Sequence, residues 1–458
     1  MTKLQNLSLF PDDMLYINRH LKFLETELGQ LYQSIPFNEL GSLLPQKKTK
    51  VGAKMRLSPK GLFGLMFLKH YTNLSDRKLI DRLNTDWAMQ LFCGIQLSED
   101  EMIKDRNMPS RVRGFIGEHV SIEDVQAVLV ESWKGDMENL HVQLNDATAY
   151  ESYIKYPTDV KLLWDSVYWV FETMHALYRV LGLRKPRSKY NEHKLAQVDY
   201  QKKRKKTYKM TRVRKRALLR LLKKGIGLLT LVQEKAEGQG ISIKEKHLIQ
   251  FIYIKEIYRQ QQYMFDNRTN QIANRIVSLF KPYLRPIVRG KENKRVEFGA
   301  KATVAQVDGI NFIDRLCFDA YNEAKELIDS IRKHRQRFGK LSQIGIDQIY
   351  GTNQNRKYMK KEGIYHSLVR KGRAAKDEGQ QKVLRKELGK ERSTVLEGSF
   401  GNEKNHYGLR KIKARTQATE IIWILFGIHT ANAVKIAKRK ARKKHSKRIV
   451  PKQLTLAA

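Results

Sequence analysis

The period of the apolar residues changes along this chain, and that change constrains the fold more than any other feature. From about residue 160 to 290 apolar residues recur with a helical period. In contrast, Arg295–Gln306 and Ile310–Phe318 alternate as strands do, and Asp308-Gly309 between them is typical of a hairpin turn. A strand pair after a long helical segment predicts an α/β protein.

Three further short strands are predicted. Leu140–Asp146 alternates apolar and polar residues, and Ser342–Asp347 and Ile364–Val369 are short apolar runs. With residues 161–290 set aside, the predicted order is strand, strand, strand, helix, strand, helix, strand, helix, helix. This order predicts a ribonuclease H-like mixed five-stranded sheet with flanking helices, interrupted by a helical insertion. In such a sheet the first and fourth strands are neighbours.

Two of these strands end on an aspartate. The first ends at Asp146 and the fourth at Asp347, so neighbouring strands would bring both carboxylates to one edge of the sheet. Glu397 lies on the helix after the fifth strand. Converging carboxylates supply the oxygen ligands that a pair of Mg²⁺ ions needs, and such a pair serves phosphoryl transfer. Taken singly, each aspartate is explained as well by a turn or helix cap at a strand exit.

A second charged pattern surrounds Glu397. Lys404 follows it by seven residues, which is nearly two helical turns, so the two side chains share one helix face. This spacing suits a metal ligand beside a phosphate-binding lysine, and it also suits a surface ion pair. Glu403 is turned by about 240° from Glu397 and therefore faces away from Lys404.

The charge of the chain predicts a polyanionic partner. Its 88 basic and 47 acidic residues give a net charge of +41, which is far more than solubility requires and favours nucleic acid. No membrane partner is expected, because we find no long uncharged apolar run and no signal peptide. Cys93 and Cys317 fit neither a disulfide framework nor a zinc pattern, which favours a reducing cytosol.

Basic residues crowd the segment 184–224 within the helical insertion. Phosphate contact explains such an excess of cations better than a solvated face does, although the insertion could also be a purely structural brace. The residues predicted to contact DNA there are Lys203, Arg204, Arg212 and Arg214.

Short helices are predicted near the N-terminus, with Ser75 and Asp86 as N-caps. Three such helices in succession are typical of a helix-turn-helix unit that enters a DNA major groove. A small helical bundle that only packs on the catalytic domain is an equally good interpretation.

Together the motifs resemble the DDE transposases of bacterial insertion sequences, in the branch marked by a Tyr-Arg-Glu-Lys signature. Asp146–Asp159 is similar to the first-aspartate motif of that family, Gly345–Gly351 to the second, and Leu396–Leu409 to the glutamate motif. The helices in Leu57–Gly94 look like the family's N-terminal domain.

The resemblance implies that Asp146, Asp347 and Glu397 are the catalytic metal ligands for two Mg²⁺ ions, for which Mn²⁺ can substitute. It implies that Lys404 contacts phosphate at the transposon end. Further DNA contacts are then predicted for Arg392, Arg410 and Lys411. The implied partners are double-stranded DNA, as terminal inverted repeats and as target, and a second copy of the chain in a homodimeric synaptic complex. The implied location is the cytoplasm, at the bacterial nucleoid.

The chain departs from the signature at two points. The signature tyrosine has no counterpart around Glu387–Lys390, and Arg392 stands one residue farther from Glu397 than the strict spacing requires. The helical insertion also follows the first strand, whereas well-known relatives are interrupted nearer the glutamate.

The predicted domains follow from these elements. Residues 1–137 form a helical N-terminal domain, 138–160 and 291–437 the catalytic domain, 161–290 the basic insertion and 438–458 a flexible basic tail. The predicted function is a transposase that cleaves and transfers the ends of an insertion sequence. Two alternatives remain open, which are a host nuclease or resolvase on the same fold and a domesticated DNA-binding protein that no longer cuts.

Overall fold

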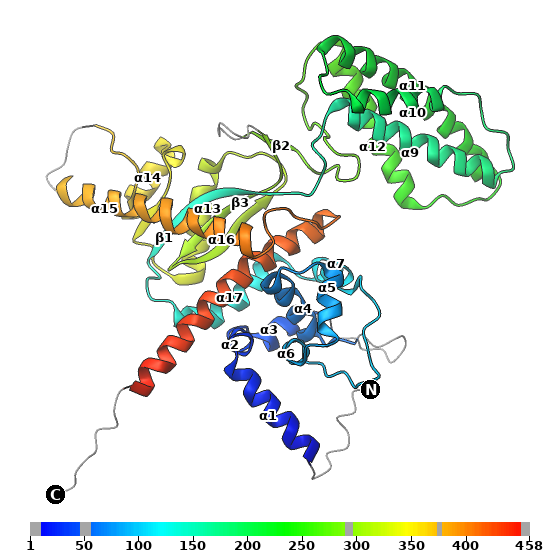
Figure 1. The fold of residues 1–458 in the computed structure, drawn as a ribbon. Coiled ribbons are helices and arrows are strands. Elements are labelled where there is room, and N and C mark those ends of the chain that lie inside the picture. The colour runs from blue at the N-terminus through cyan, green and yellow to red at the C-terminus, as the bar shows by residue number, and fades with distance from the viewer. Residues whose placement is uncertain (1–10, 46–55, 289–295, 373–377, 450–458) are drawn as a thin grey trace, which may run out of the picture. The chain divides into compact units, whose positions relative to one another are not determined.

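The computed structural model describes residues 11–45, 56–288, 296–372 and 378–449 (Figure 1). The chain forms two compact units. One comprises Ile154–Gly299 with Phe318–Ala320 and is called the helical unit. The other comprises Met1–Tyr153, Ala300–Cys317 and Tyr321–Ala458 and is called the sheet unit.

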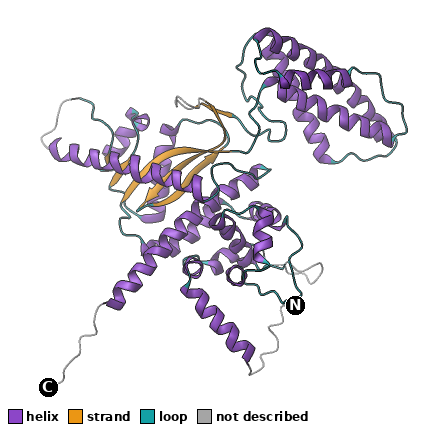
Figure 2. Cartoon of the chain, in the orientation of Figure 1, coloured by secondary structure: helices purple, strands orange, loops and turns teal. Residues whose placement is uncertain are grey.

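The sheet unit is built on a curled mixed sheet (Figure 2). Its strands follow the order β4-β3-β1-β5-β6, where β3 and β4 are antiparallel and β5 is parallel to both β1 and β6. The first and fourth predicted strands, β1 and β5, are therefore neighbours, as expected. The strands are β1 (Val142–Glu151), β3 (Val296–Val307), β4 (Ile310–Cys317), β5 (Gln343–Gly345) and β6 (Tyr365–His366).

Helices precede the sheet in sequence and confirm the predicted helical N-terminal region. Ser58, Ser75 and Asp86 each cap a helix, because their side chains accept hydrogen bonds from backbone N–H groups of the first turn. The helices are α1 (Pro11–Glu25), α2 (Glu27–Gln33), α3 (Phe37–Ser42), α4 (Pro59–Thr72), α5 (Asp76–Leu83), α6 (Trp87–Phe92), α7 (Met108–His119) and α8 (Ile122–Trp133).

The last helix, α17 (Gln417–Ile449), is the core helix of the sheet unit. It packs against α4 and α7 (Figure 1), and the Phe426 ring lies 5.8 Å from that of Phe63 and 5.2 Å from that of Phe67. By length and composition Gln417–Lys444 could cross a membrane, but 83% of its most apolar window is buried inside the protein. Such burial is typical of a core helix.

The prediction of a flexible tail from residue 438 is wrong for the described part of that segment. The helix α17 continues to Ile449. Arg439 Nη1 lies 2.7 Å from Asp308 Oδ2, and Lys435 Nζ donates to the carbonyl oxygen of Gly309. These contacts with the turn between β3 and β4 fix the C-terminal part of α17, although its basic composition predicts a solvent-exposed segment.

A second correction concerns residues 371–391, whose basic composition predicts a loose segment. They include α15 (Glu378–Glu391), and its Leu388 is buried. A Cβ atom at Gly345 of β5 would lie 3.0 Å from the Leu388 carbonyl oxygen, so the helix approaches the strand closely. The other helices beside the sheet are α13 (Leu327–Phe338), α14 (Asn353–Lys361) and α16 (Glu397–His406).

The helical unit contains α9 (Asp159–Val180), α10 (Tyr190–Lys202), α11 (Tyr208–Gly238) and α12 (Glu245–Asp266) around a shared apolar core. The short strand β2 (Pro286–Val288) pairs there with the first residues of β3. Gly225 lets α11 approach α9, because a Cβ atom there would lie 2.9 Å from the Phe171 ring.

The apolar pattern of Asn270–Phe280 predicts a helix, and the structure has none there. Asn274 has a φ of +53°, and the Gln260 side chain bonds both the Asn274 carbonyl oxygen and the Ile276 N–H. The Gln260 side chain therefore satisfies two backbone groups of this segment that would otherwise bond within a helix.

Candidate active site

Asp146 lies in the middle of β1, so the prediction that the strand ends there is wrong: β1 continues to Glu151. The Asp146 carboxylate accepts from the Ala147 N–H at 2.8 Å and from Arg392 Nη1 at 2.7 Å. Burial raises its pKa, the Ala147 N–H and Arg392 oppose that rise, and the charges of Glu323 and Glu397 add to it. The net shift of this pKa is upward, chiefly because burial disfavours the charged carboxylate.

Asp347 lies just beyond the neighbouring strand. The β1–β5 register ends at the pair Leu144 and Gly345, so each aspartate stands two residues past that pair on its own strand. The Asp347 side chain accepts from the Gln348 N–H at 2.7 Å and caps the short helix η3 (Gln348–Tyr350). Asp347 therefore caps η3 and also lies near Asp146, so the two interpretations of this residue are compatible.

Two residues that sequence patterns did not single out lie among these acids. Burial raises the pKa of Tyr350, and the charges of Glu323, Asp146, Tyr321 and Asp347 raise it further. The Tyr350 hydroxyl is buried without a hydrogen-bond partner among the described residues. Glu323 pairs with Lys301 at 2.6 Å. Tyr350 stands three residues after Asp347, within the segment Gly345–Gly351, but the motif assigns it no role. No motif marks Glu323, which reaches the acids only through the packing of the sheet unit.

Glu397 begins α16 directly after a π-helical turn, η4 (Arg392–Leu396). The Glu397 N–H donates to the Arg392 carbonyl oxygen, which is the i→i+5 pattern of a π-helix. This wider turn accommodates one residue more than an α-helical turn does. It therefore absorbs the one-residue offset that sets Arg392 apart from the strict family spacing.

As a result, Arg392 lies between two of the predicted metal ligands. Its Nη1 atom is 2.7 Å from Asp146 Oδ2 and 3.3 Å from Glu397 Oε1. The turn η4 also packs against β1. The structure thus joins Asp146 and Glu397 through one guanidinium, although 251 residues separate them in sequence (397 minus 146).

The donor chemistry of the site fits a divalent cation. Carboxylate oxygens are the ligands that Mg²⁺ prefers. Burial is the main cause of the raised pKa of Asp146, and the smaller contributions of Glu323 and Glu397 show that two further carboxylates act on the same group. Among the described residues, no three His, Cys, Asp or Glu side chains already lie close enough to hold one metal ion. Arg392 occupies the space between two of the three predicted ligands.

The side chains of Lys404 and Glu403 lie on different faces of α16, as the helical period predicts. Lys404 Nζ lies 2.8 Å from Thr148 Oγ1 of β1. Glu403 is buried, where it accepts hydrogen bonds from the Tyr150 hydroxyl at 2.6 Å and from Asn311 Nδ2 at 2.5 Å. Burial raises the pKa of Glu403 although both donors oppose the rise. Glu403 is thus a core residue of the sheet unit.

A basic cleft of about 860 Å³ runs beside Lys404 within the sheet unit. It lies between the α4–α5 connection, α7 and the segment after α16. Its one lining acid among the described residues is Asp76, which pairs with Lys69 and Arg113. Sequence patterns predicted three of its cations, Lys404, Arg410 and Lys411, and missed Arg77, Arg111, Lys413 and Arg415.

Two segments match known protein families. Residues 16–114 match the family described as Transposase domain (DUF772), and residues 344–430 match the family described as Transposase DDE domain. These matches support a DDE transposase of an insertion sequence. The second match contains Asp347, Glu397 and Lys404. Neither the curated proteins nor the solved structures give a significant match to the chain.

The basic residues predicted to contact DNA in the helical unit have different surroundings. Lys203 and Arg204 are exposed between α10 and α11, and Arg212 lies with its guanidinium 4.3 Å from the Phe265 ring. Arg214 is buried, and its guanidinium donates to Gln197 Oε1 at 3.0 Å and to the His193 carbonyl oxygen at 2.7 Å. The structure therefore corrects the prediction for Arg214, which ties α11 to α10.

Proposed function

We propose that this transposase cleaves DNA at the ends of an insertion sequence and joins them to target DNA on a ribonuclease H-like sheet. The observation that carries the proposal is the approach of Asp146 and Glu397 to one guanidinium, with Asp347 two residues past the end of the adjacent strand β5. The strand order β4-β3-β1-β5-β6 supports the ribonuclease H-like assignment, because it places the first and fourth core strands side by side.

In this proposal Asp146, Asp347 and Glu397 are the ligands of two Mg²⁺ ions, for which Mn²⁺ can substitute. When bound, such a pair of ions activates the attacking oxygen and stabilises the leaving oxygen of an in-line displacement. Arg392 positions two of the carboxylates through its contacts with both. Its planar guanidinium also suits a DNA phosphate, with which it can form two parallel hydrogen bonds.

The proposed reaction has two steps of the same kind. Water attacks a phosphodiester at the end of the element and releases a 3′-hydroxyl, and that hydroxyl then attacks a phosphodiester of the target. No side chain becomes covalently attached to DNA. The basic cleft holds the DNA beside the acids through Lys404, Arg410 and Lys411, which neutralise phosphate charge.

The proposed partners follow from this reaction. They are the terminal inverted repeats, the target DNA and a second copy of the chain in a synaptic homodimer, in the cytoplasm at the bacterial nucleoid. Residues 1–137 would contribute DNA binding and residues 161–290 would clamp DNA, while 138–160 with 291–437 carry the chemistry.

The decisive experiment separates DNA cleavage from DNA binding. Asp146→Asn and Glu397→Gln should abolish Mg²⁺-dependent nicking of a terminal repeat and leave its binding within about twofold, since neither substitution removes a phosphate contact. Glu391→Gln is the matched control, because Glu391 is an exposed acid directly before the π-helical segment and the variant should nick normally.

Three outcomes would contradict the proposal. Nicking by the Asp146→Asn or Glu397→Gln protein would remove these residues from the chemistry. Nicking that does not depend on the terminal repeat, with no strand joining, would favour a host nuclease. Binding without any cleavage by the unaltered chain would favour a DNA-binding protein that no longer cuts.

A further inference from the structure

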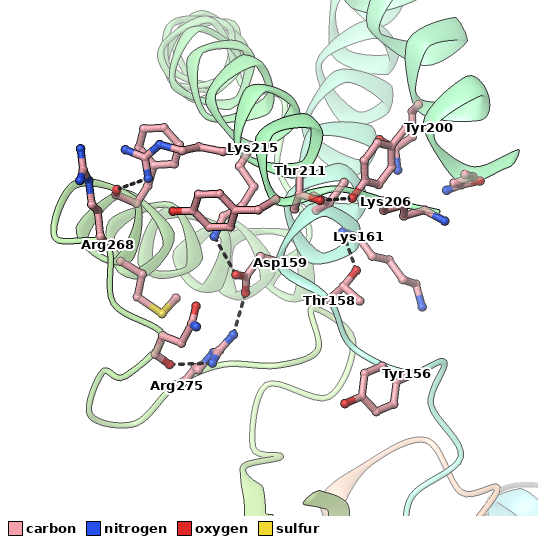
Figure 3. A pocket seen from close by; sticks show the side chains of 18 of the residues that line it. Tyr156, Thr158, Asp159, Lys161, Tyr200, Lys206, Thr211, Lys215, Arg268 and Arg275 are labelled. Carbon is pink, nitrogen blue, oxygen red and sulfur yellow. Dashed lines mark hydrogen bonds and ion pairs between the residues drawn. The ribbon is translucent and has the colours of Figure 1, made fainter. Parts of the chain in front are cut away.

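The helical unit contains a cavity of about 880 Å³ (Figure 3). Its wall is formed by the start of α9, the connection between α10 and α11, the first turns of α11, and the chain after α12. A volume of this size is in the range of pockets that enclose a small organic ligand. All of the residues that line it belong to the helical unit.

One carboxylate, Asp159, organises the wall of the cavity. Its two oxygens accept hydrogen bonds from Lys215 Nζ at 2.8 Å and Arg275 Nη2 at 2.7 Å (Figure 3). Gln261 Nε2 also donates to this carboxylate, at 3.1 Å. Burial would raise the pKa of Asp159, but the two cations outweigh that effect and the net shift is downward. Asp159 is therefore ionised, and its hydrogen bonds connect α9 with α11, α12 and the segment after α12.

The remaining charges in the wall are positive. Asp159 is the one carboxylate among the lining residues that the structure describes, and two cations already balance it. Five further cations line the same cavity, namely Lys155, Lys161, Lys206, Arg212 and Arg268. Burial lowers the pKa of Lys161, Asp165 opposes that effect and Lys155 adds to it. A bound anion would relieve this repulsion, so the cavity favours a ligand with negative charge.

Aromatic rings line the cavity between these cations. The Arg212 guanidinium lies 4.3 Å from the centre of the Phe265 ring, and Lys206 Nζ lies 5.6 Å from that of Tyr200. Tyr208, the first residue of α11, is 73% exposed, and Tyr156 is 71% exposed. An exposed ring that lines a cavity offers a flat surface against which a planar ligand can stack.

We propose that this cavity binds one nucleotide unit, with its phosphate at Arg212 and Arg268 and its base stacked on Tyr208. A duplex fits this chemistry poorly, because its bases are stacked on one another and present only their edges in the grooves. An unpaired nucleotide in a DNA strand and a free nucleoside phosphate share the required chemistry. The proposal does not depend on the metal ligands or on strand cleavage.

The test measures binding of the full chain to short labelled DNA without divalent metal and at fixed salt concentration. The probes are a single-stranded thymidine oligonucleotide and a duplex of equal length, and the readout is fluorescence anisotropy. Tyr208→Ala should weaken single-strand binding roughly tenfold and leave duplex binding within about twofold, because loss of one stacked base costs about that much. Tyr208→Phe should bind as the unaltered chain does.

Matched controls separate the cavity from the general charge of the unit. Tyr168→Ala on α9 removes an exposed tyrosine outside the cavity, and Arg220→Ala on α11 removes an exposed arginine outside it. Arg268→Ala should reduce the salt dependence of single-strand binding by about 0.7 in the slope of log K against log salt concentration. Arg220→Ala should leave that slope unchanged.

Competition with adenosine monophosphate distinguishes the two sources of the ligand. If it displaces the oligonucleotide from the unaltered chain and from Arg220→Ala alike, and this displacement requires Tyr208, the cavity accepts free nucleotides. If it does not displace the oligonucleotide, the cavity requires an unpaired nucleotide within a strand. The proposal is overturned if Tyr208→Ala binds like Tyr168→Ala, or if it weakens duplex and single-strand binding equally.

Discussion

The two units contain opposite arrangements of charge. In the sheet unit one guanidinium, Arg392, lies between two carboxylates, Asp146 and Glu397. In the helical unit one carboxylate, Asp159, lies between two cations, Lys215 and Arg275. The first arrangement leaves an excess of negative charge beside a cation, and the second leaves an excess of positive charge around an acid. The same chain thus offers one site suited to a metal ion and another suited to phosphate.

The largest expected effect concerns Asp347, the one of the three proposed metal ligands for which the structure shows no contact with Arg392. Asp347→Asn should lower the rate of strand cleavage by roughly a thousandfold or more, as loss of one member of a catalytic unit does. Asparagine can still cap η3, so the free energy of unfolding should change by less than about 0.5 kcal/mol. A cleavage assay and a urea titration check both expectations. Cleavage that persists would leave Asp347 with its capping role alone.

The next effect concerns the acid of the helical unit. Asp159→Asn leaves Lys215 and Arg275 partly buried without their partner, so it should lower the free energy of unfolding by about 3 kcal/mol. Urea denaturation followed by circular dichroism measures this change. Asp199→Asn, at an exposed position of α10, should have almost no effect. Equal stability of the two variants would show that Asp159 does not organise the cavity wall.

A smaller effect tests whether Arg392 competes with a cation. Arg392→Ala should increase the apparent affinity for Mg²⁺ in the absence of DNA by roughly tenfold, since about 1.4 kcal/mol of competing ion pairing is lost. Thermal unfolding at increasing Mg²⁺ concentration measures the affinity, because a ligand of the folded state raises the Tm. Arg385→Ala on α15 is the control. An unchanged Mg²⁺ affinity would contradict the competition.

The smallest effect is a dependence on pH. Because the pKa of Asp159 is lower in the folded chain than in the unfolded chain, its contribution to stability is complete above the unfolded value of about 3.9. That contribution is lost as the pH falls through the folded pKa. The stability difference between the unaltered chain and Asp159→Asn should therefore shrink in strong acid. A difference that grows as the pH falls would reverse the assigned sign.

Sequence patterns predicted the parts of the fold that depend on local periodicity. The hairpin at Asp308-Gly309 formed where predicted, and both of its residues have positive φ. The adjacency of the strands before Asp146 and Asp347 followed from the order of elements. Helical phase correctly separated Glu397 from Glu403, because side-chain direction along a helix is fixed by its 100° step.

Other features depended on contacts between distant segments. Within residues 371–391, α15 forms where Leu388 packs near β5. The helix α17 continues through the basic residues after Ala437, where Arg439 pairs with Asp308. Arg214 was predicted to contact DNA from its composition, but its hydrogen bonds to α10 bury it. The number of basic residues in a sequence does not reveal which of them are buried and form hydrogen bonds inside the protein.

The sequence by itself indicated which carboxylates could meet, because the order of strands and helices along the chain predicts a sheet in which β1 and β5 are neighbours, and the helical period fixes the direction of Glu397. The tertiary structure alone decided what lies between them. A π-helical turn packed on β1 moved Arg392 by one residue and placed it between Asp146 and Glu397. Such a turn has no sequence signature here, since its formation depends on packing against a strand some 250 residues earlier, where contact energies outweigh the local preference for an α-helix.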